Sequence, residues 1–140
     1  MTPFTHVRVL VIHQGQIALV RHRDARDGVS YWLPPGGGSE RDESAEAAAV
    51  REVHEETGLE VRIIAEVPVP EERGYTCFLA QLTGSGTITP EHEPPVDGVY
   101  ATGAAWHPVS IDAPLALMQP EYWSELAEPI RVELRRQSAP

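Results

Sequence analysis

The sequence has little of the features that mark secreted, membrane-spanning or disulfide-linked proteins. Its 140 residues include a single cysteine, Cys77, so no intramolecular disulfide can form, which fits a reducing compartment. No apolar run approaches the roughly 20 residues that a membrane-spanning helix needs. The apolar run at residues 7–12 is short and contains Arg8, so it resembles a strand more than a secretion signal. We therefore expect a cytoplasmic protein with no membrane partner.

Basic residues are also scarce. The chain has 11 Lys and Arg residues against 21 Asp and Glu residues, which gives a formal net charge of −10. This balance argues against stable binding to nucleic acids or anionic membranes, and a phosphorylated ligand would need a local positive site. The length is typical of one domain, so we expect residues 1–140 to form a single unit. The assembly state stays open, a homodimer included.

The pattern of apolar and turn residues predicts an α/β protein with a mixed sheet between helices. Two β-branched runs, residues 7–12 and 16–21, flank the turn sequence HQG and predict a hairpin. We expect no regular structure over residues 31–42, which contain two prolines and three glycines. The other expected elements are a central helix at 43–57, strands at 61–69, 75–82 and 103–109, a polar loop at 83–98, and a helix at 120–136 interrupted at Pro129.

Three glutamates of the central helix are expected to share one face. At 100° per residue, Glu55 and Glu56 lie within about 60° of Glu52 on the helix surface. Each like-charged pair costs about 0.2–0.5 kcal/mol, so a compensating cation is expected, with a solvated acidic face as the ordinary alternative. The glycines before the helix can offer bare carbonyls, and Mg²⁺ prefers such carboxylate and carbonyl oxygens. An apolar stripe is expected beside the glutamates, formed by Val50, Val53 and Thr57.

The segment from Gly37 to Leu59 resembles the signature of the Nudix hydrolase family. That signature reads G-x5-E-x7-R-E-U-x-E-E-x-G-U, in which U is a bulky aliphatic residue. The sequence matches every fixed position: Gly37, Glu43, Arg51, Glu52, Val53, Glu55, Glu56, Gly58 and Leu59. The earlier YWLPPGGG and the later AAWHPV are also similar to the family's pattern, so the resemblance covers about residues 7–109.

This resemblance implies an α/β/α sandwich that hydrolyses a nucleoside diphosphate linked to another moiety. It implies that Mg²⁺ or Mn²⁺ is held by the carboxylates of Glu52, Glu55 and Glu56, with the carbonyl of Gly36 as a further ligand. It also implies that Arg51 orients the catalytic glutamate.

The general base is open between the helix and a distant loop. Glu52 is the first candidate, and Glu93 or Asp97 is the alternative, because some members of the family draw the base from a loop. The family often has an acidic residue shortly before the late tryptophan, but YATGAAW, which ends at Trp106, has none. Glu91, Glu93 or Asp97 could supply that metal contact from the loop.

Further residues are candidates for substrate binding. Arg21 and Arg23 could bind phosphates, with surface solubility as the alternative. Trp32 and Tyr31 could stack on a base, although an aromatic residue beside a strand is more often part of the core. Tyr75 lies sixteen residues after Leu59, close to where the diadenosine polyphosphate hydrolases of the family carry a tyrosine.

The expected substrate is therefore a small nucleotide, with a dinucleoside polyphosphate as the first candidate. The alternatives are ADP-ribose or a nucleotide sugar, and a nucleoside triphosphate. A non-catalytic nucleotide sensor is less favoured, because such proteins commonly lose a glutamate of the motif and this chain keeps all of them.

Overall fold

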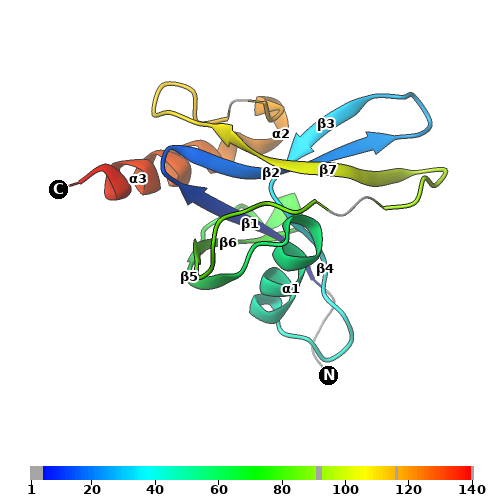
Figure 1. Ribbon diagram of the computed structural model, residues 1–140, viewed down its shortest axis with the longest axis horizontal. Helices are drawn as coiled ribbons and strands as arrows, with labels where there is room; N and C mark the ends of the chain where they lie inside the picture. Colours follow the sequence, from blue (N-terminus) through cyan, green and yellow to red (C-terminus); the bar gives the residue numbers. More distant parts are fainter. Residues whose placement is uncertain (1–4, 91–92, 116, 140) are drawn as a thin grey trace.

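The computed structural model describes residues 5–90, 93–115 and 117–139, and shows a mixed seven-stranded sheet with helices (Figure 1). The strands are β1 (His6–His13), β2 (Gln16–Asp24), β3 (Ser30–Leu33), β4 (Gly36–Gly38), β5 (Val61–Val67), β6 (Thr76–Leu82) and β7 (Val99–Pro108). The helices are α1 (Ala45–Thr57), α2 (Pro120–Trp123) and α3 (Ala127–Ser138), with 3-10 turns η1 (Glu71–Arg73) and η2 (Ser124–Leu126).

Strand β1 is the centre of the sheet. It pairs antiparallel with β4 at its start and with β2 at its end, and it pairs parallel with β6 along its middle. Strand β2 also pairs with β3 and β7, while β6 also pairs with β5. The predicted β1–β2 hairpin is confirmed, and Gln14 and Gly15 form its turn with positive φ angles.

Alternate residues of β1 belong to two hydrophobic cores. Val7, Val9 and Val11 pack with buried residues of α1. Leu10 and Ile12 pack with buried residues of η2 and α3. Because successive side chains of a strand point to opposite faces, α1 and α3 cover opposite faces of the sheet. The expected sandwich of a mixed sheet between helices is therefore confirmed.

Helix α1 lies within two residues of its predicted limits. The Ser44 side chain accepts a hydrogen bond from the Ala47 N–H, and Gly58 ends the helix in a left-handed conformation. Val50 was expected in the apolar stripe, but 37% of it is exposed. That prediction is wrong because the buried residues of α1 lie closer to the face that carries the glutamates than Val50 does. Its buried members are Ala48, Ala49, Val53 and Thr57.

Two strands form within residues 31–42, where no regular structure was expected. Strand β3 pairs with β2, and the three glycines of β4 pair with β1 from His6 to Arg8. A Cβ added at Gly36 would fall on the Val7 carbonyl, so only a residue without a side chain fits this close pairing. The prediction is wrong because a partner strand far away in the sequence outweighs the weak strand propensity of glycine.

The C-terminal helical segment breaks earlier than predicted. Helix α2 ends at η2, and Pro129 lies in the first turn of α3 rather than at the break. Proline is tolerated there because the N–H groups of a first helical turn have no partner within the helix. Among the described residues, no helix is long and apolar enough to cross a membrane.

Strand β7 is longer than the predicted strand at 103–109. It spans ten residues, nine of which pair with β2, and the register shifts between Arg21 and His22. Its added first residues continue the sheet beyond the predicted limit, and the Ala101 carbonyl accepts a hydrogen bond from the Glu93 N–H at 3.1 Å. The end of the polar loop is thereby held beside the strand.

Candidate active site

The three glutamates of α1 face a cavity of about 700 Å³ rather than open solvent. We call Glu52, Glu55 and Glu56 the acidic face. Gly36 and Gly37 of β4 lie opposite and line the same cavity. The remaining lining residues come from β1, β2, β3, β7 and the loop before β7: His6, Arg8, His22, Tyr31, Leu33, Glu93, Pro94, Val99 and Ala101.

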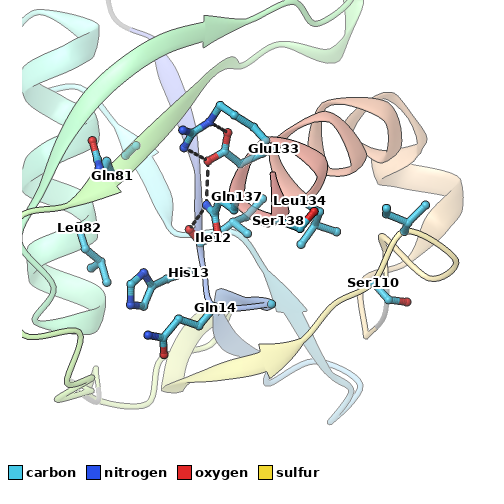
Figure 2. Close-up of a pocket in the computed structure, with 14 residues that line it drawn as sticks. Ile12, His13, Gln14, Gln81, Leu82, Ser110, Glu133, Leu134, Gln137 and Ser138 are labelled. Carbon is cyan, nitrogen blue, oxygen red and sulfur yellow. Dashed lines mark hydrogen bonds and ion pairs between the residues drawn. The ribbon is translucent and has the colours of Figure 1, made fainter. Parts of the chain in front are cut away.

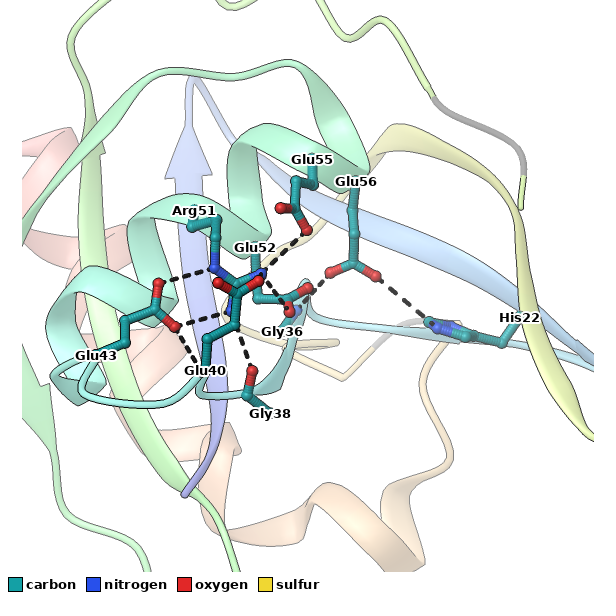
Figure 3. Close-up of polar contacts among 9 residues, drawn as sticks. All are labelled: His22, Gly36, Gly38, Glu40, Glu43, Arg51, Glu52, Glu55 and Glu56. Carbon is teal, nitrogen blue, oxygen red and sulfur yellow. Dashed lines mark hydrogen bonds and ion pairs between the residues drawn. The ribbon is translucent and has the colours of Figure 1, made fainter. Parts of the chain in front are cut away.

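Arg51 holds one end of the acidic face (Figure 3). Its Nε and Nη2 donate to the two Glu43 oxygens at 2.8 and 2.9 Å, and Nη2 also donates to the Gly38 carbonyl at 3.1 Å. Its Nη1 donates to Glu52 at 3.0 Å and to Glu55 at 3.1 Å. The bonds from Arg51 lower the pKa of Glu43 to about 2. An arginine of the same helix therefore offsets part of the repulsion between the glutamates.

Glu56 differs from its two neighbours because no described hydrogen bond joins it to Arg51. It accepts a hydrogen bond from the Gly36 N–H at 2.8 Å, and its other oxygen lies 4.0 Å from His22 Nε2. Burial raises the pKa of Glu56 to about 8. Burial and the charge of Arg8 lower the pKa of His22 to about 4. At neutral pH Glu56 therefore keeps its proton and His22 is neutral.

Gly37 allows Glu52 to approach β4. A Cβ added at Gly37 would lie 2.7 Å from a Glu52 carboxylate oxygen, which is closer than a Cβ contact permits. Burial raises the pKa of Glu52, although its bond from Arg51 acts in the opposite direction. Gly37, the first fixed residue of the sequence motif, thus leaves room for the side chain of Glu52, a later fixed residue of the same motif.

The acidic face fits a divalent cation in its donor chemistry. Hard cations prefer carboxylate oxygens, and a cation would replace the proton that burial leaves on Glu56. Across residues 5–90, 93–115 and 117–139, no three His, Cys, Asp or Glu side chains already converge as metal ligands. Arg51 holds Glu52 and Glu55, so a cation would compete with it for their oxygens. Metal binding by these glutamates and Gly36 stays a prediction.

The polar loop brings one of its candidate carboxylates to the cavity. Glu93 lines the cavity with the acidic face, and its charge acts on Glu56. Asp97 is exposed and is not among the lining residues. Glu91 lies outside the described residues. Of the loop candidates for the base that the structure describes, Glu93 is therefore the one placed at the site.

Three of the predicted substrate-binding residues lie away from the cavity. Arg21 and Arg23 are exposed on β2, and Trp32 packs against the core that contains α3. Their strand neighbour His22 and the other stacking candidate, Tyr31, line the cavity. The difference follows from the alternation of side chains along a strand, which sends adjacent residues to opposite faces.

A second hollow of about 530 Å³ adjoins the cavity, because Tyr31 and Leu33 line both. We call its apolar wall the aromatic cup, formed by Tyr31, Leu33, Tyr75, Tyr122 and Trp123. The Tyr75 hydroxyl donates to Glu125 at 2.7 Å, and its ring centroid lies 5.5 Å from that of Trp123. Tyr75 is thus placed beside the acidic face but in a separate part of the site.

A third cavity, of about 670 Å³, lies at the other end of β1 and is lined partly by α3 (Figure 2). Arg136 donates to the two Glu133 oxygens at 2.7 and 2.6 Å, and Gln137 donates to the Ile12 carbonyl at 2.7 Å. Because Glu133 and Arg136 pair with each other, this cavity has no comparable cluster of unpaired charge.

Residues 3–123 match the family model of the NUDIX domain. The chain belongs to the Nudix hydrolase family. The membership predicted from the segment between Gly37 and Leu59 is therefore confirmed, and so is the Nudix type of the fold, which solved Nudix structures share.

The Nudix domain is similar to proteins that are named for different activities. A provisionally named 8-oxo-dGTP diphosphatase of Bacillus subtilis (strain 168) is 33% identical over 103 residues, covering 70% of this chain and 62% of that protein. An RNA pyrophosphohydrolase of Novosphingobium aromaticivorans is 44% identical over 61 residues, covering 41% and 37%. The crystal structure of an ADP-ribose pyrophosphatase from Streptococcus suis 89-1591 is 26% identical, covers 93% of each chain and has a TM-score of 0.62. The matches span less than two thirds of the first two proteins.

Two residues that line the Nudix cavity, Arg8 and His22, were not among the predicted site residues. Arg8 lies within the run VRVLVI and His22 directly follows the run QIALVR, and neither residue was assigned to the site from sequence. A charged residue in the middle of a buried strand was the available signal for Arg8, because such residues are seldom buried without a partner.

Proposed function

We propose that this Nudix domain hydrolyses a phosphoanhydride bond of a small nucleotide, with Mg²⁺ or Mn²⁺ bound at the acidic face. The observation that carries this proposal is the geometry of the acidic face, whose three glutamates line one cavity opposite the glycines of β4. A divalent cation would balance the negative charge of these carboxylates. The names of the similar proteins support the same class of bond.

The residues of the cavity suggest how the reaction would proceed. Glu52, Glu55 and Glu56, with the Gly36 carbonyl, would hold the metal, which neutralises phosphate charge and lowers the pKa of a bound water. Arg51 would orient Glu52 through their 3.0 Å hydrogen bond. Glu52 would accept the proton of the attacking water, and Glu93 is the alternative base because it lines the same cavity.

For the substrate, we propose that a nucleoside lies in the aromatic cup while its phosphates extend to the acidic face. Stacking of a base on aromatic side chains contributes about 1–3 kcal/mol per base. A dinucleoside polyphosphate is the first candidate, because Tyr75 belongs to the cup. ADP-ribose or a nucleotide sugar, and a nucleoside triphosphate, are the alternatives that the names of the similar proteins support.

A panel of nucleotides tests both the class and the substrate. The protein is incubated in Mg²⁺ with a dinucleoside polyphosphate, ADP-ribose, a nucleotide sugar and a nucleoside triphosphate, and the products are separated by chromatography. We expect turnover to require the metal and the dinucleoside polyphosphate to have the highest kcat/KM. Full turnover in excess chelator would contradict the metal's role, and a higher value for ADP-ribose would remove the support from Tyr75.

Water labelled with heavy oxygen tests which bond is broken. Attack at phosphorus should place the label on a phosphate group of one product, which mass spectrometry can identify. Label found only on a sugar carbon would mean cleavage of a glycosidic bond, and the proposed reaction would then be wrong.

A further inference from the structure

Arg8 lies between the two parts of the candidate site. It is on β1, directly opposite Gly36 of β4, and it lines the cavity with the acidic face. Its guanidinium carbon lies 6.0 Å from the centroid of the Trp123 ring in the aromatic cup. Its charge acts on glutamates of the acidic face and also on Tyr31 and Tyr75 of the cup. One side chain is therefore within reach of both regions.

Arg8 has few partners of its own. Its Nη1 donates to the Pro34 carbonyl at 3.1 Å, and this is the single hydrogen bond that the Arg8 side chain makes to the described residues. Among those residues, no carboxylate oxygen lies within 4.0 Å of its nitrogens, whereas Arg51 has four carboxylate neighbours within that distance. A guanidinium carries five N–H donors, so most of those of Arg8 have no acceptor in the part of the chain that the structure describes.

A partly buried cation with no carboxylate in contact is unfavourable, because burial removes part of its hydration and one carbonyl replaces only some of it. The third cavity shows the usual arrangement, in which Arg136 pairs with Glu133 at 2.6 Å. At Arg8 the nearby carboxylates are engaged elsewhere, since Glu52 accepts from Arg51 and Glu56 accepts from the Gly36 N–H. The partner that suits Arg8 is therefore an anion that enters the cavity from outside.

We propose that Arg8 binds a phosphate group of the nucleotide at the junction between the acidic face and the aromatic cup. The nature of the nucleotide rests on the proposed function. With the base in the cup and the metal at the acidic face, the phosphate at Arg8 is the one attached to the nucleoside. A guanidinium suits this position because its parallel N–H donors match two phosphate oxygens. Arg8 would then supply the local positive charge that an acidic protein needs for such a ligand.

The test compares Arg8→Met and Arg8→Gln with the native chain. Calorimetry in Mg²⁺ measures the affinity for AMP, for inorganic pyrophosphate and for adenosine, and thermal melts without ligand measure stability. Charge-assisted hydrogen bonds dominate the contribution of Arg8, so both variants should lose about tenfold or more of their affinity for AMP. Affinity for adenosine, which has no phosphate, should change by less than about twofold.

Arg62→Met is the matched control. Arg62 is an exposed arginine of β5 whose side chain bonds Gln81 at 2.9 Å, and it lines none of the three cavities. Its replacement removes the same charge from the chain as Arg8→Met does. The affinities of this control for AMP and pyrophosphate should equal those of the native protein, which separates a local contact from a general effect of charge.

The stability of the variants distinguishes binding from a structural role. If Arg8 serves an anion, Arg8→Met should melt at or above the native temperature without ligand, since an unpaired charge is removed. If both variants melt at a lower temperature and bind AMP as tightly as the native protein, the role of Arg8 is to stabilise the loop at Pro34, and the inference is wrong. If Arg8→Met does not fold, the AMP affinity of Arg8→Gln, which keeps an N–H donor for Pro34, decides the question.

The binding assay does not depend on turnover. If no nucleotide is hydrolysed but AMP affinity depends on Arg8, the proposed function fails and the phosphate contact stands. If hydrolysis proceeds and AMP affinity does not depend on Arg8, the contact fails and the proposed function stands.

Discussion

The acidic face and the aromatic cup are built in different ways. The acidic face and the glycines opposite it come from one segment, residues 36–56, whose members are neighbours on one helix and one short strand. The cup takes its residues from β3, from Tyr75 just before β6 and from α2, so that more than forty residues separate Leu33 from Tyr75 and Tyr75 from Tyr122. A short motif can therefore specify the acidic face, the proposed metal site, whereas the cup, the proposed nucleoside site, depends on how the whole chain folds.

The largest effect should come from breaking the acidic face itself. Glu52→Gln keeps the shape of the side chain but removes the proposed base and one proposed metal ligand, so activity should fall by at least about 10²-fold. The melting temperature without metal should hold or rise slightly, because a repulsion is relieved. Added Mg²⁺ should stabilise the native protein more than the variant.

Enzyme assays and melts with and without Mg²⁺ measure these quantities. The matched control is Glu46→Gln, which removes a charge in the first turn of α1, away from the cavity. If Glu52→Gln stays active and gains as much from Mg²⁺ as the native protein, Glu52 is neither base nor ligand. If it unfolds without metal, the glutamate is structural.

A smaller loss is expected when the space between β4 and α1 is filled. Gly37→Ala would place a methyl group 2.7 Å from the present position of a Glu52 oxygen, so that the carboxylate must move. A displacement of about 1 Å can reduce catalysis by up to about 10²-fold, and we expect a loss of at least tenfold in kcat. Gly98→Ala is the control, because a Cβ there has no atom within 4 Å. Equal kcat values in the two variants would show that Glu52 tolerates the shift.

Changes in the cup should alter binding and leave the chemical step intact. Tyr122 is 59% exposed, so Tyr122→Ala should lower stability little. Loss of one stacking surface should raise KM for the preferred nucleotide by about fivefold or more, with kcat unchanged and pyrophosphate affinity unchanged. Val132→Ala, at an exposed position of α3, provides the control for truncation. A fall in kcat with constant KM would mean that Tyr122 contributes to the chemical step. The aromatic cup and the acidic face would then not have separate roles.

The smallest effect concerns stability and pH. The folded-state pKa of Glu56 is raised to about 8 from an ordinary value of 4.5, so the folded state holds a proton that the unfolded chain releases. Between these two values stability therefore falls as pH rises. In chelator, Glu56→Gln should melt a few degrees above the native protein at pH 9, and the difference should vanish at pH 4. Melts at several pH values measure this, and a difference independent of pH would mean that Glu56 titrates normally.

The local parts of the site were predictable from sequence. The face shared by Glu52, Glu55 and Glu56 follows from the 3.6-residue period of a helix, and the helix limits follow from Ser44 and Gly58. These features depend on residues within one or two turns of each other, so no knowledge of the rest of the chain was needed.

The parts that depend on pairing were not predictable in the same way. The choice between Trp32 and Tyr31 as the residue facing the cavity depends on strand register, and a slip of one residue reverses it. The glycines of β4 form a strand only because β1 lies beside them. Arg8 appeared in an apolar run, and its exposure to the cavity becomes evident only when α1 and β4 are placed around it.

The parallel pairing of β1 with β6 sets a condition on when the site can form during folding. Val7 pairs with Thr76, so a loop of almost seventy residues must close before this pairing exists. Contacts between residues so far apart in sequence form slowly, because the chain loses entropy before the contact stabilises it. Helix α1 can form early from local interactions, but Tyr75, next to the start of β6, reaches the cup only with this closure. The acidic face should therefore be ordered before the aromatic cup, and pulse-labelled hydrogen exchange during refolding should show protection of α1 ahead of β6.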